Sequence, residues 1–176
     1  EGYGRYDSRC CKRLIMEKQY DDKTIQQYYH ELKDFVMAHT EDVMKNPRAF
    51  IRYPFIDPGS VYDGNVWDWD TFWSVYGFLN LADEYEDPSV KERLVEHAKG
   101  NVYNFLIISG RGYIPMMIEV ADWPEPYLNM KHKEGVMMNM HKPFLCRQIC
   151  LISEYIQDYS WVETYLDNIE KIFFLL

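Results

Sequence analysis

Basic residues are scarce in this sequence. Lys and Arg number 19 against 28 Asp and Glu, so the formal net charge is −9 at pH 7. Because phosphate binding needs clustered Lys and Arg, we expect no nucleic-acid partner and no anionic membrane surface.

Long apolar runs are also missing, since none approaches the roughly 18 residues that a membrane span requires. The 176 residues therefore predict a single domain, residues 1–176, that does not associate with a membrane.

Cysteine is sparse and poorly spaced for a metal site. Cys10 and Cys11 are adjacent, whereas Cys146 and Cys150 lie four apart among apolar residues of an expected helix. A structural zinc site needs closely spaced pairs of Cys or His. Buried free thiols are the favoured interpretation, and we predict no metal and no other cofactor.

The first residues show no targeting signal. Glu1-Gly2-Tyr3-Gly4 has no initiator Met and is followed by neither a basic nor an apolar signal region. The start resembles an internal position of a longer protein, so localisation is left open, with the cytoplasm slightly favoured.

Strand-like alternation is weak throughout, whereas helical periodicity is clear. Apolar residues recurring at three and four positions predict helices at about residues 24–46, 71–86, 88–108, 143–156 and 160–176. Thr24 and Ser160 are expected to cap the first and last helices, and Pro88 suits a first helical turn. Pro47 should end the first helix, because Pro cannot continue it.

Two long connections, residues 47–69 and 110–142, separate these helices. Short turns join the second helix to the third and the fourth to the fifth, as antiparallel neighbours require. The predicted fold class is all-α, built from αα-hairpins. In a ring of such hairpins the two long connections gather at one end, where a binding site would form.

The densest set of aromatic and acidic residues lies in the first connection. Trp67-Asp68-Trp69-Asp70 follows several turn residues and precedes the second helix. Aromatic side chains of this kind suit the apolar C–H faces of sugar rings, and carboxylates suit sugar hydroxyls.

These residues resemble the signatures of trehalases and of glycoside hydrolase family 63, in particular its mannosylglycerate and glucosylglycerate hydrolase-like members. The similarity rests on three stretches in the family's order, covering about residues 47–176. They are Pro58-Gly59 with Trp67-Asp68-Trp69-Asp70-Thr71-Phe72-Trp73, then Gly112-Tyr113-Ile114-Pro115, then Asn139-Met140-His141-Lys142-Pro143-Phe144-Leu145.

The resemblance implies an (α/α)6 toroid, of the six-hairpin kind, with a sugar pocket at its mouth. It places Trp69 and Asp70 at the sugar whose bond is cut, with Trp67 stacking nearby and Lys142, beside His141, in the pocket wall. A cation at Lys142 would suit an anionic substituent such as a glycerate carboxylate. The alternatives are that the Trp residues fill the core and that residues 141–142 form a solvated loop tip.

Asp68 and Asp70 are unsuited to be the catalytic pair. Glycoside hydrolysis by inversion needs two carboxyl groups roughly 6.5–9.5 Å apart on opposite sides of the bond. Two residues this close in sequence, at a helix N-terminus that favours ionised carboxylates, cannot easily supply a protonated acid and a base. If residues 67–70 are extended, the two Trp face one way and the two Asp the other. Asp68 is then the expected N-cap, and Asp70 the ligand-binding residue.

The resemblance also departs from the family. The Arg expected soon after Pro58-Gly59 is absent, Met116 replaces an Asn, and Lys142 replaces a Gln. Trehalose is therefore disfavoured, and an α-glucoside or α-mannoside is expected. The family's acid and base would lie beyond Leu176, so no catalytic residue is predicted here.

The sequence thus favours part of a glycoside hydrolase that binds an oligosaccharide or small glycoside. The alternative is a non-catalytic helical module that binds a carbohydrate or a protein. An incomplete ring would leave an apolar edge near residues 161–176, through which the chain could self-associate.

Overall fold

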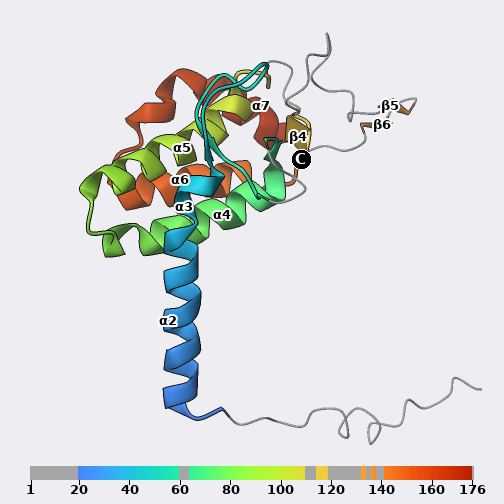
Figure 1. The fold of residues 1–176 in the computed structure, drawn as a ribbon. Helices are drawn as coiled ribbons and strands as arrows, with labels where there is room; N and C mark the ends of the chain where they lie inside the picture. The colour runs from blue at the N-terminus through green and yellow to red at the C-terminus, as the bar shows by residue number, and fades with distance from the viewer. Residues whose placement is uncertain are drawn as a thin grey trace, which may run out of the picture. The chain divides into compact units, whose positions relative to one another are not determined.

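The computed structural model describes residues 20–59, 64–109, 114–118, 132–133, 136–137 and 141–175. The chain divides between Phe35 and Val36 into two compact units. In order, the elements are α2 (Asp22–Ala38), α3 (Thr40–Val43), β1 (Met44–Lys45), β2 (Phe55–Ile56), β3 (Val66–Trp67), α4 (Asp68–Leu81), the 3-10 helix η2 (Ala82–Glu84), α5 (Pro88–Leu106), β4 (Met117–Ile118), β5 (His132–Lys133), β6 (Val136–Met137), α6 (Leu145–Ile156), the 3-10 helix η3 (Ser160–Tyr165) and α7 (Leu166–Leu175) (Figure 1).

The mainly helical class is confirmed, and the strands that the structure adds are only two residues long. Three antiparallel ladders of two residues per strand pair β1 with β2, β3 with β4, and β5 with β6. Strands this short cannot display a recognisable alternation in the sequence. The partner of β3 also lies in a distant segment, which no local pattern reveals.

Helix α2 begins earlier than its sequence pattern indicated. Asp21 is the capping residue, because its carboxylate accepts the backbone N–H of Thr24 at 2.7 Å, and this hydrogen bond lowers the pKa of Asp21. Thr24 lies inside the helix. The predicted apolar stripe is present, but no residue of α2 is buried. Five residues of this stripe are 50–64% exposed. These five are Ile25, Tyr28, Tyr29, Leu32 and Phe35.

The same helix also ends earlier than expected, well before Pro47. Its last residue is Ala38, and the short helix α3 follows after His39. The hydroxyl of Thr40 donates to the carbonyl of Val36 at 3.0 Å, and the imidazole of His39 lies 2.8 Å from the carboxylate of Asp42. Side chains that bond to nearby backbone in this way compete with the helical ladder, and periodicity alone does not register them.

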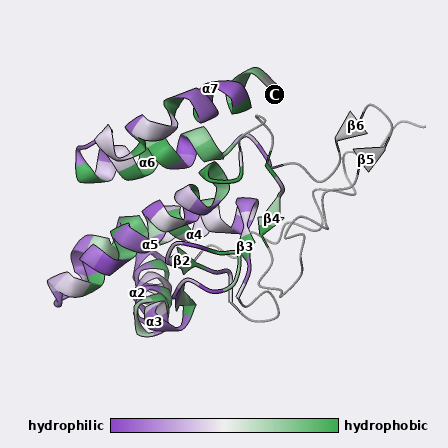
Figure 2. Ribbon diagram, turned by 90° about the horizontal axis from the view of Figure 1, so that it is seen from above, coloured by the Kyte–Doolittle hydropathy of each residue, from purple (hydrophilic) through white to green (hydrophobic). Residues whose placement is uncertain are grey.

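Helix α5 is central to the second unit. It packs against α4, α6 and β2 (Figure 1). Figure 2 shows that α5 carries both hydrophilic and hydrophobic stretches. Its apolar residues Leu94, Ala98, Val102 and Phe105 are fully buried. The predicted start is confirmed, with Pro88 in the first turn behind an Asp87 cap.

Two asparagines on α5 hold the backbone that leads into β2. Asn101 accepts the N–H of Ile56 at 2.8 Å and donates to the carbonyl of the same residue at 3.2 Å. One turn later, Asn104 accepts the N–H groups of Arg52 and Tyr53 at 2.8 and 3.0 Å and donates to the Tyr53 carbonyl at 3.1 Å. These bonds satisfy backbone groups that are buried at Ile56 and partly buried at Arg52 and Tyr53.

Gly100 permits this close approach. A Cβ atom at Gly100 would lie 1.8 Å from the carbonyl oxygen of Pro54. Only glycine lets the backbone of residues 52–56 lie against the helix in this way. The first long connection is thereby fixed to α5 shortly before it reaches the residues of interest.

The C-terminal part of the second unit begins with α6, close to the predicted start. Its face of Leu145, Ile149 and Ile152 is buried. Cys146 and Cys150 are free thiols, but both are only half-buried, so the expectation of full burial is wrong for them. Their α-helical spacing places them beside the buried face and not within it. Cys10 and Cys11 lie outside the described residues.

The last helical segment begins as a 3-10 helix, and Ser160 does not cap it. Asp158 accepts the N–H of Ser160 at 2.8 Å, and η3 leads into α7. The predicted apolar edge is confirmed: Leu166, Phe173 and Phe174 are 56%, 67% and 77% exposed.

Candidate functional site

Helix α4 starts inside the aromatic and acidic motif. Trp67 is extended, with φ −107° and ψ 139°, and the helix begins at Asp68. The backbone N–H of Asp68 donates to the carbonyl of Met116 at 2.8 Å. Residues 67–70 are therefore extended only at Trp67, because pairing with β4 ends there and the helix begins. The two-faced arrangement considered for an extended segment does not apply. Asp68, Trp69 and Asp70 point in successive directions around the first turn.

The two long connections meet at this point, as predicted. Strand β3 pairs with β4, so that Val66 faces Ile118 and Trp67 faces Met117. A further bond runs from the N–H of His141 to the carbonyl of Ile114 at 2.9 Å. Three segments that are far apart in sequence therefore lie together at the start of α4.

Asp68 is the joint between them. Its carboxylate is 2% exposed and accepts the N–H of Trp69 at 2.6 Å and the N–H of Lys142 at 2.7 Å. The ammonium of Lys142 lies 3.3 and 3.4 Å from its two oxygens. A buried carboxylate is tolerated when donors and a cation surround it. The predicted N-cap role is wrong, because Trp67 occupies that position and Asp68 binds a distant segment.

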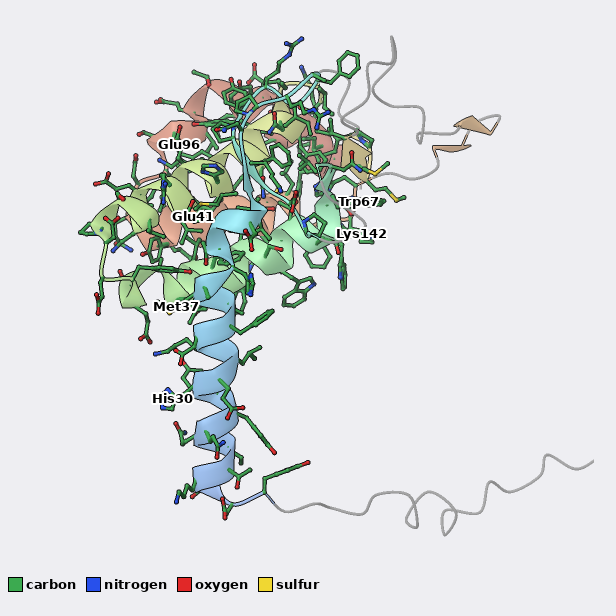
Figure 3. The ribbon with its side chains drawn as sticks, viewed as in Figure 1. His30, Met37, Glu41, Trp67, Glu96 and Lys142 are labelled. Atoms are coloured by element: carbon green, nitrogen blue, oxygen red, sulfur yellow. The ribbon has the colours of Figure 1, made fainter. Side chains whose placement is uncertain are left out.

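Lys142 lies at the surface of the site. Its side chain is 45% exposed, and its Nζ lies 5.8 Å from the ring centroid of Trp69. Figure 3 places Lys142 next to Trp67 at this end of α4. The Lys142 ammonium therefore contacts both Asp68 and an aromatic ring.

Trp69 presents the accessible aromatic surface. Its side chain is 43% exposed and makes T-shaped contacts with Phe144 and Trp73, at centroid distances of 5.1 and 5.9 Å. Phe144 in turn stacks on Phe72 at 4.8 Å. These contacts restrain the indole before any ligand arrives, which lowers the entropy lost on binding. Trp67 is partly buried beside it.

Asp70 is the accessible carboxylate of the motif. It is partly exposed, and within the described parts of the chain its side chain has no hydrogen bond or ion pair. It is thus free to accept hydrogen bonds from a ligand, which the buried Asp68 is not.

His141 lies beneath the surface. Its side chain is 4% exposed and packs at 90° against the ring of Phe105, with centroids 4.5 Å apart. Burial lowers the pKa of His141 to about 4, so the imidazole is neutral near pH 7. Its Nδ1 bonds to the carbonyl of Lys142, so Nδ1 carries the proton. Predicted to touch the substrate, His141 is instead placed to support Lys142, because its ring cannot reach solvent.

Two further buried polar groups escaped sequence reasoning. Thr71 and Gln148 are each 1% exposed, on α4 and α6 respectively, and these two helices pack together. In the described structure, Thr71 Oγ1, Gln148 Nε2 and His141 Nε2 have no hydrogen-bond partner. A polar residue within an apolar helical stripe was the available signal, and neither residue was singled out.

Asp57 was also overlooked. Its carboxylate is buried and accepts the N–H groups of Gly59 and Gly64 at 2.7 and 3.0 Å, while Lys45 lies 3.6 Å away. Both glycines have positive φ, of 71° and 83°, which other residues rarely adopt. Asp57 therefore binds the backbone at Gly59 and Gly64, shortly before β3.

A pocket of about 340 Å³ lies elsewhere in the second unit. Its lining consists of Lys45, Asn46, Pro47, Arg48, Phe55 and Gly64. None of the predicted site residues lines it, so it does not bear on the site at Trp69.

The comparisons leave the family open. The chain matches no protein-family model, no curated protein and no solved structure. Within the described ranges, no three His, Cys, Asp or Glu side chains are grouped as metal ligands would be. No described helix combines the length and apolarity needed to cross a bilayer.

Proposed function

We propose that this chain forms part of the sugar pocket of a glycoside hydrolase acting on an α-glucoside or α-mannoside. The observation that carries the proposal is the contact of Asp68 with Lys142, which joins two sequence stretches that resemble glycosidase signatures. The first of these stretches also carries an exposed indole at Trp69 and, at Asp70, a carboxylate with no hydrogen bond or ion pair to the described residues.

The chemistry of this surface suits a sugar. The indole of Trp69 offers an apolar face for the C–H groups of a pyranose ring. Asp70 can accept hydrogen bonds from two neighbouring hydroxyls, since a carboxylate has about four acceptor positions. Charged acceptors form stronger hydrogen bonds than neutral ones, so Asp70 orients the ring while Trp69 supplies contact area.

The proposed architecture is an (α/α)6 toroid. Asp68 at the start of α4 bonds to Lys142 just before α6, so these two packed helices begin at the same end. Helix α5 contacts both. An inner helix, a returning outer helix and the next inner helix give this arrangement in a ring of αα-hairpins.

The acid and base of the proposed enzyme lie outside the motif. Asp68 is buried and fully hydrogen-bonded, so Asp70 is the one carboxylate of residues 67–70 that can reach a ligand. Hydrolysis needs a second carboxyl group across the scissile bond. We therefore expect this chain alone to bind a sugar without cleaving it.

Titration calorimetry of the chain with methyl α-glucoside and methyl α-mannoside tests the proposal. Asp70→Asn and Trp69→Ala should each weaken binding about tenfold, the usual effect of losing one charged hydrogen bond or one stacking contact. Asp167→Asn on α7 is the matched control for charge and should have no effect. The absence of binding to either glycoside, or unaltered affinity in both site variants, overturns the proposal.

A non-catalytic carbohydrate-binding module is the second candidate. It is favoured by the single accessible carboxylate in the motif, since binding needs no second one. An assay of sugar release by the natural polypeptide separates the two. Binding with turnover supports the hydrolase, whereas binding without turnover supports the module.

A further inference from the structure

The two carboxylates at the start of α4 differ in whether a cation lies beside them. Asp68 and Lys142 neutralise each other, with the ammonium 3.3 Å from the nearer carboxylate oxygen. Asp70 has no cation beside it among the described residues. His141 is neutral near pH 7 because burial lowers its pKa to about 4. The charges of Asp68, Asp70 and Lys142 together therefore leave one negative charge at the start of α4, counted over these described groups.

Resting on the sugar site proposed above, we propose that this site selects neutral glycosides and rejects sugars that carry a carboxylate or a phosphate. The sequence indicated that Lys142 suits an anionic substituent. In the structure its ammonium is already paired with the carboxylate of Asp68, which limits its availability to a ligand.

Lys142 cannot turn to an anionic ligand without cost. Asp68 is 2% exposed, so withdrawing the ammonium would leave a buried carboxylate without its cation. The negative charge of Asp70, two residues after Asp68 in the same helical turn, also opposes an anion at this end of α4. Both effects act only on charged ligands.

The helix N-terminus does not offset this repulsion. Free backbone N–H groups at the start of a helix commonly bind anions. Here the N–H of Asp68 donates to Met116, and the N–H of Trp69 donates to the Asp68 carboxylate. The N–H of Lys142 is also taken by Asp68. Three of the backbone donors near the site are therefore occupied by the protein itself.

The test compares ligands that differ in one group. Calorimetry of the whole chain is performed with methyl α-glucoside and methyl α-glucuronide, and with methyl α-mannoside and methyl α-mannuronide. At low salt each uronide should bind about fivefold more weakly than its neutral partner, which is the effect of one unit charge about 4 Å away in water. The difference should shrink at 0.5 M salt, because exposed charges are screened.

Charge variants identify the residues responsible. Asp70→Asn should bring the affinity ratio of neutral to anionic ligand close to one, even if both affinities fall. Asp68→Asn should move the ratio further, in favour of the uronide, because it releases the Lys142 ammonium. Where circular dichroism shows that Asp68→Asn is unfolded, Lys142→Met serves instead and should widen the preference for the neutral ligand. Asp167→Asn is the control for net charge.

The outcomes distinguish this inference from the function on which it rests. Equal binding of neutral and anionic glycosides by the wild-type chain, or tighter binding of the uronides, overturns the inference alone. A preference for neutral ligands that Asp70→Asn leaves unchanged also overturns it. Failure of all four glycosides to bind overturns the proposed function together with the inference.

Discussion

Acid should destabilise this protein through one buried side chain, His141. Its pKa is 6.5 in the unfolded chain and falls to about 4 in the folded protein because of burial. Between these two values the unfolded state binds more protons than the folded state, so stability decreases as the pH falls through this window. Below about pH 4 both states are protonated at this residue, and no further loss follows.

The magnitude follows from the size of the pKa shift. A difference of about 2.5 units at about 1.36 kcal/mol per unit limits the effect to roughly 3.4 kcal/mol, of which about 3 kcal/mol is lost by pH 4. This is a large part of the total stability of an ordinary domain.

Urea unfolding, followed by tryptophan fluorescence at intervals between pH 7.5 and pH 4, measures the effect. His141→Gln keeps an amide donor near the Lys142 carbonyl but cannot take up a proton. Carboxylates that titrate in the same range affect both proteins, so the difference between their free energies of unfolding isolates His141. That difference should change by about 3 kcal/mol across the range.

His30→Gln provides the control, because His30 is exposed on α2. Its unfolding free energies should follow those of the wild type at every pH. Parallel profiles for the wild type and His141→Gln would show that the burial of His141 does not set the acid sensitivity, and the reasoning would fail.

Three further outcomes are expected. Gly100→Ala should destabilise the protein by about 3 kcal/mol or more in urea unfolding, because the new Cβ would lie 1.8 Å from the Pro54 carbonyl oxygen. Gly77→Ala is the control: a Cβ there has open space around it, so the substitution should stabilise the protein by about 0.5–1 kcal/mol. Equal effects of the two substitutions would contradict the packing described for α5. Asn104→Ala should cost about 1–3 kcal/mol, since it leaves partly buried backbone groups of residues 52 and 53 without their amide partner. A loss below about 0.5 kcal/mol would show that water replaces the amide. In sedimentation velocity the chain should self-associate as its concentration rises. Phe173→Ser should reduce this association, because the Phe173 ring is 67% exposed. A wild-type chain that stays monomeric would refute the predicted self-association.

The helices that could be predicted were those with local signals. Pro88 after an Asp87 cap fixed the start of α5, and the apolar spacing of α6 placed its buried face. The predicted caps failed where another side chain intervened, as with Asp21 before α2 and Asp158 before η3, although η3 begins at Ser160 as predicted. Capping carboxylates one to three residues outside a periodic run leave that run unchanged, so periodicity cannot locate them.

The contacts between distant segments could not be predicted. Gly100 and Asn101 are poor helix formers inside a long helix, yet they bind the backbone before β2. Such residues within a strong helical pattern signal a specific packing role, but not the partner. The apolar stripe of α2 shows that amphipathic spacing predicts a helix but not the burial of its apolar face, which is exposed here.

The sequence motif locates the candidate site, but the structure gives some of its residues a different role. Trp69 and Asp70 remain the surface residues, as expected from the sequence. Asp68 is buried and links distant segments because the helix starts at that residue. His141 lies below the surface because its backbone N–H bonds to the carbonyl of Ile114. Both changes depend on pairing across the chain and are invisible to local spacing.

The joint at Asp68 has a consequence for folding. Its partner Lys142 lies 74 residues further along the chain. Closing a loop of this length is entropically costly, and contacts of large sequence separation form slowly. During synthesis, the surface around Trp69 cannot assemble until residue 142 has emerged and α5 has packed. Until then the indoles of residues 67 and 69 belong to an unfinished chain, which makes this interval the one in which aggregation competes most strongly with folding.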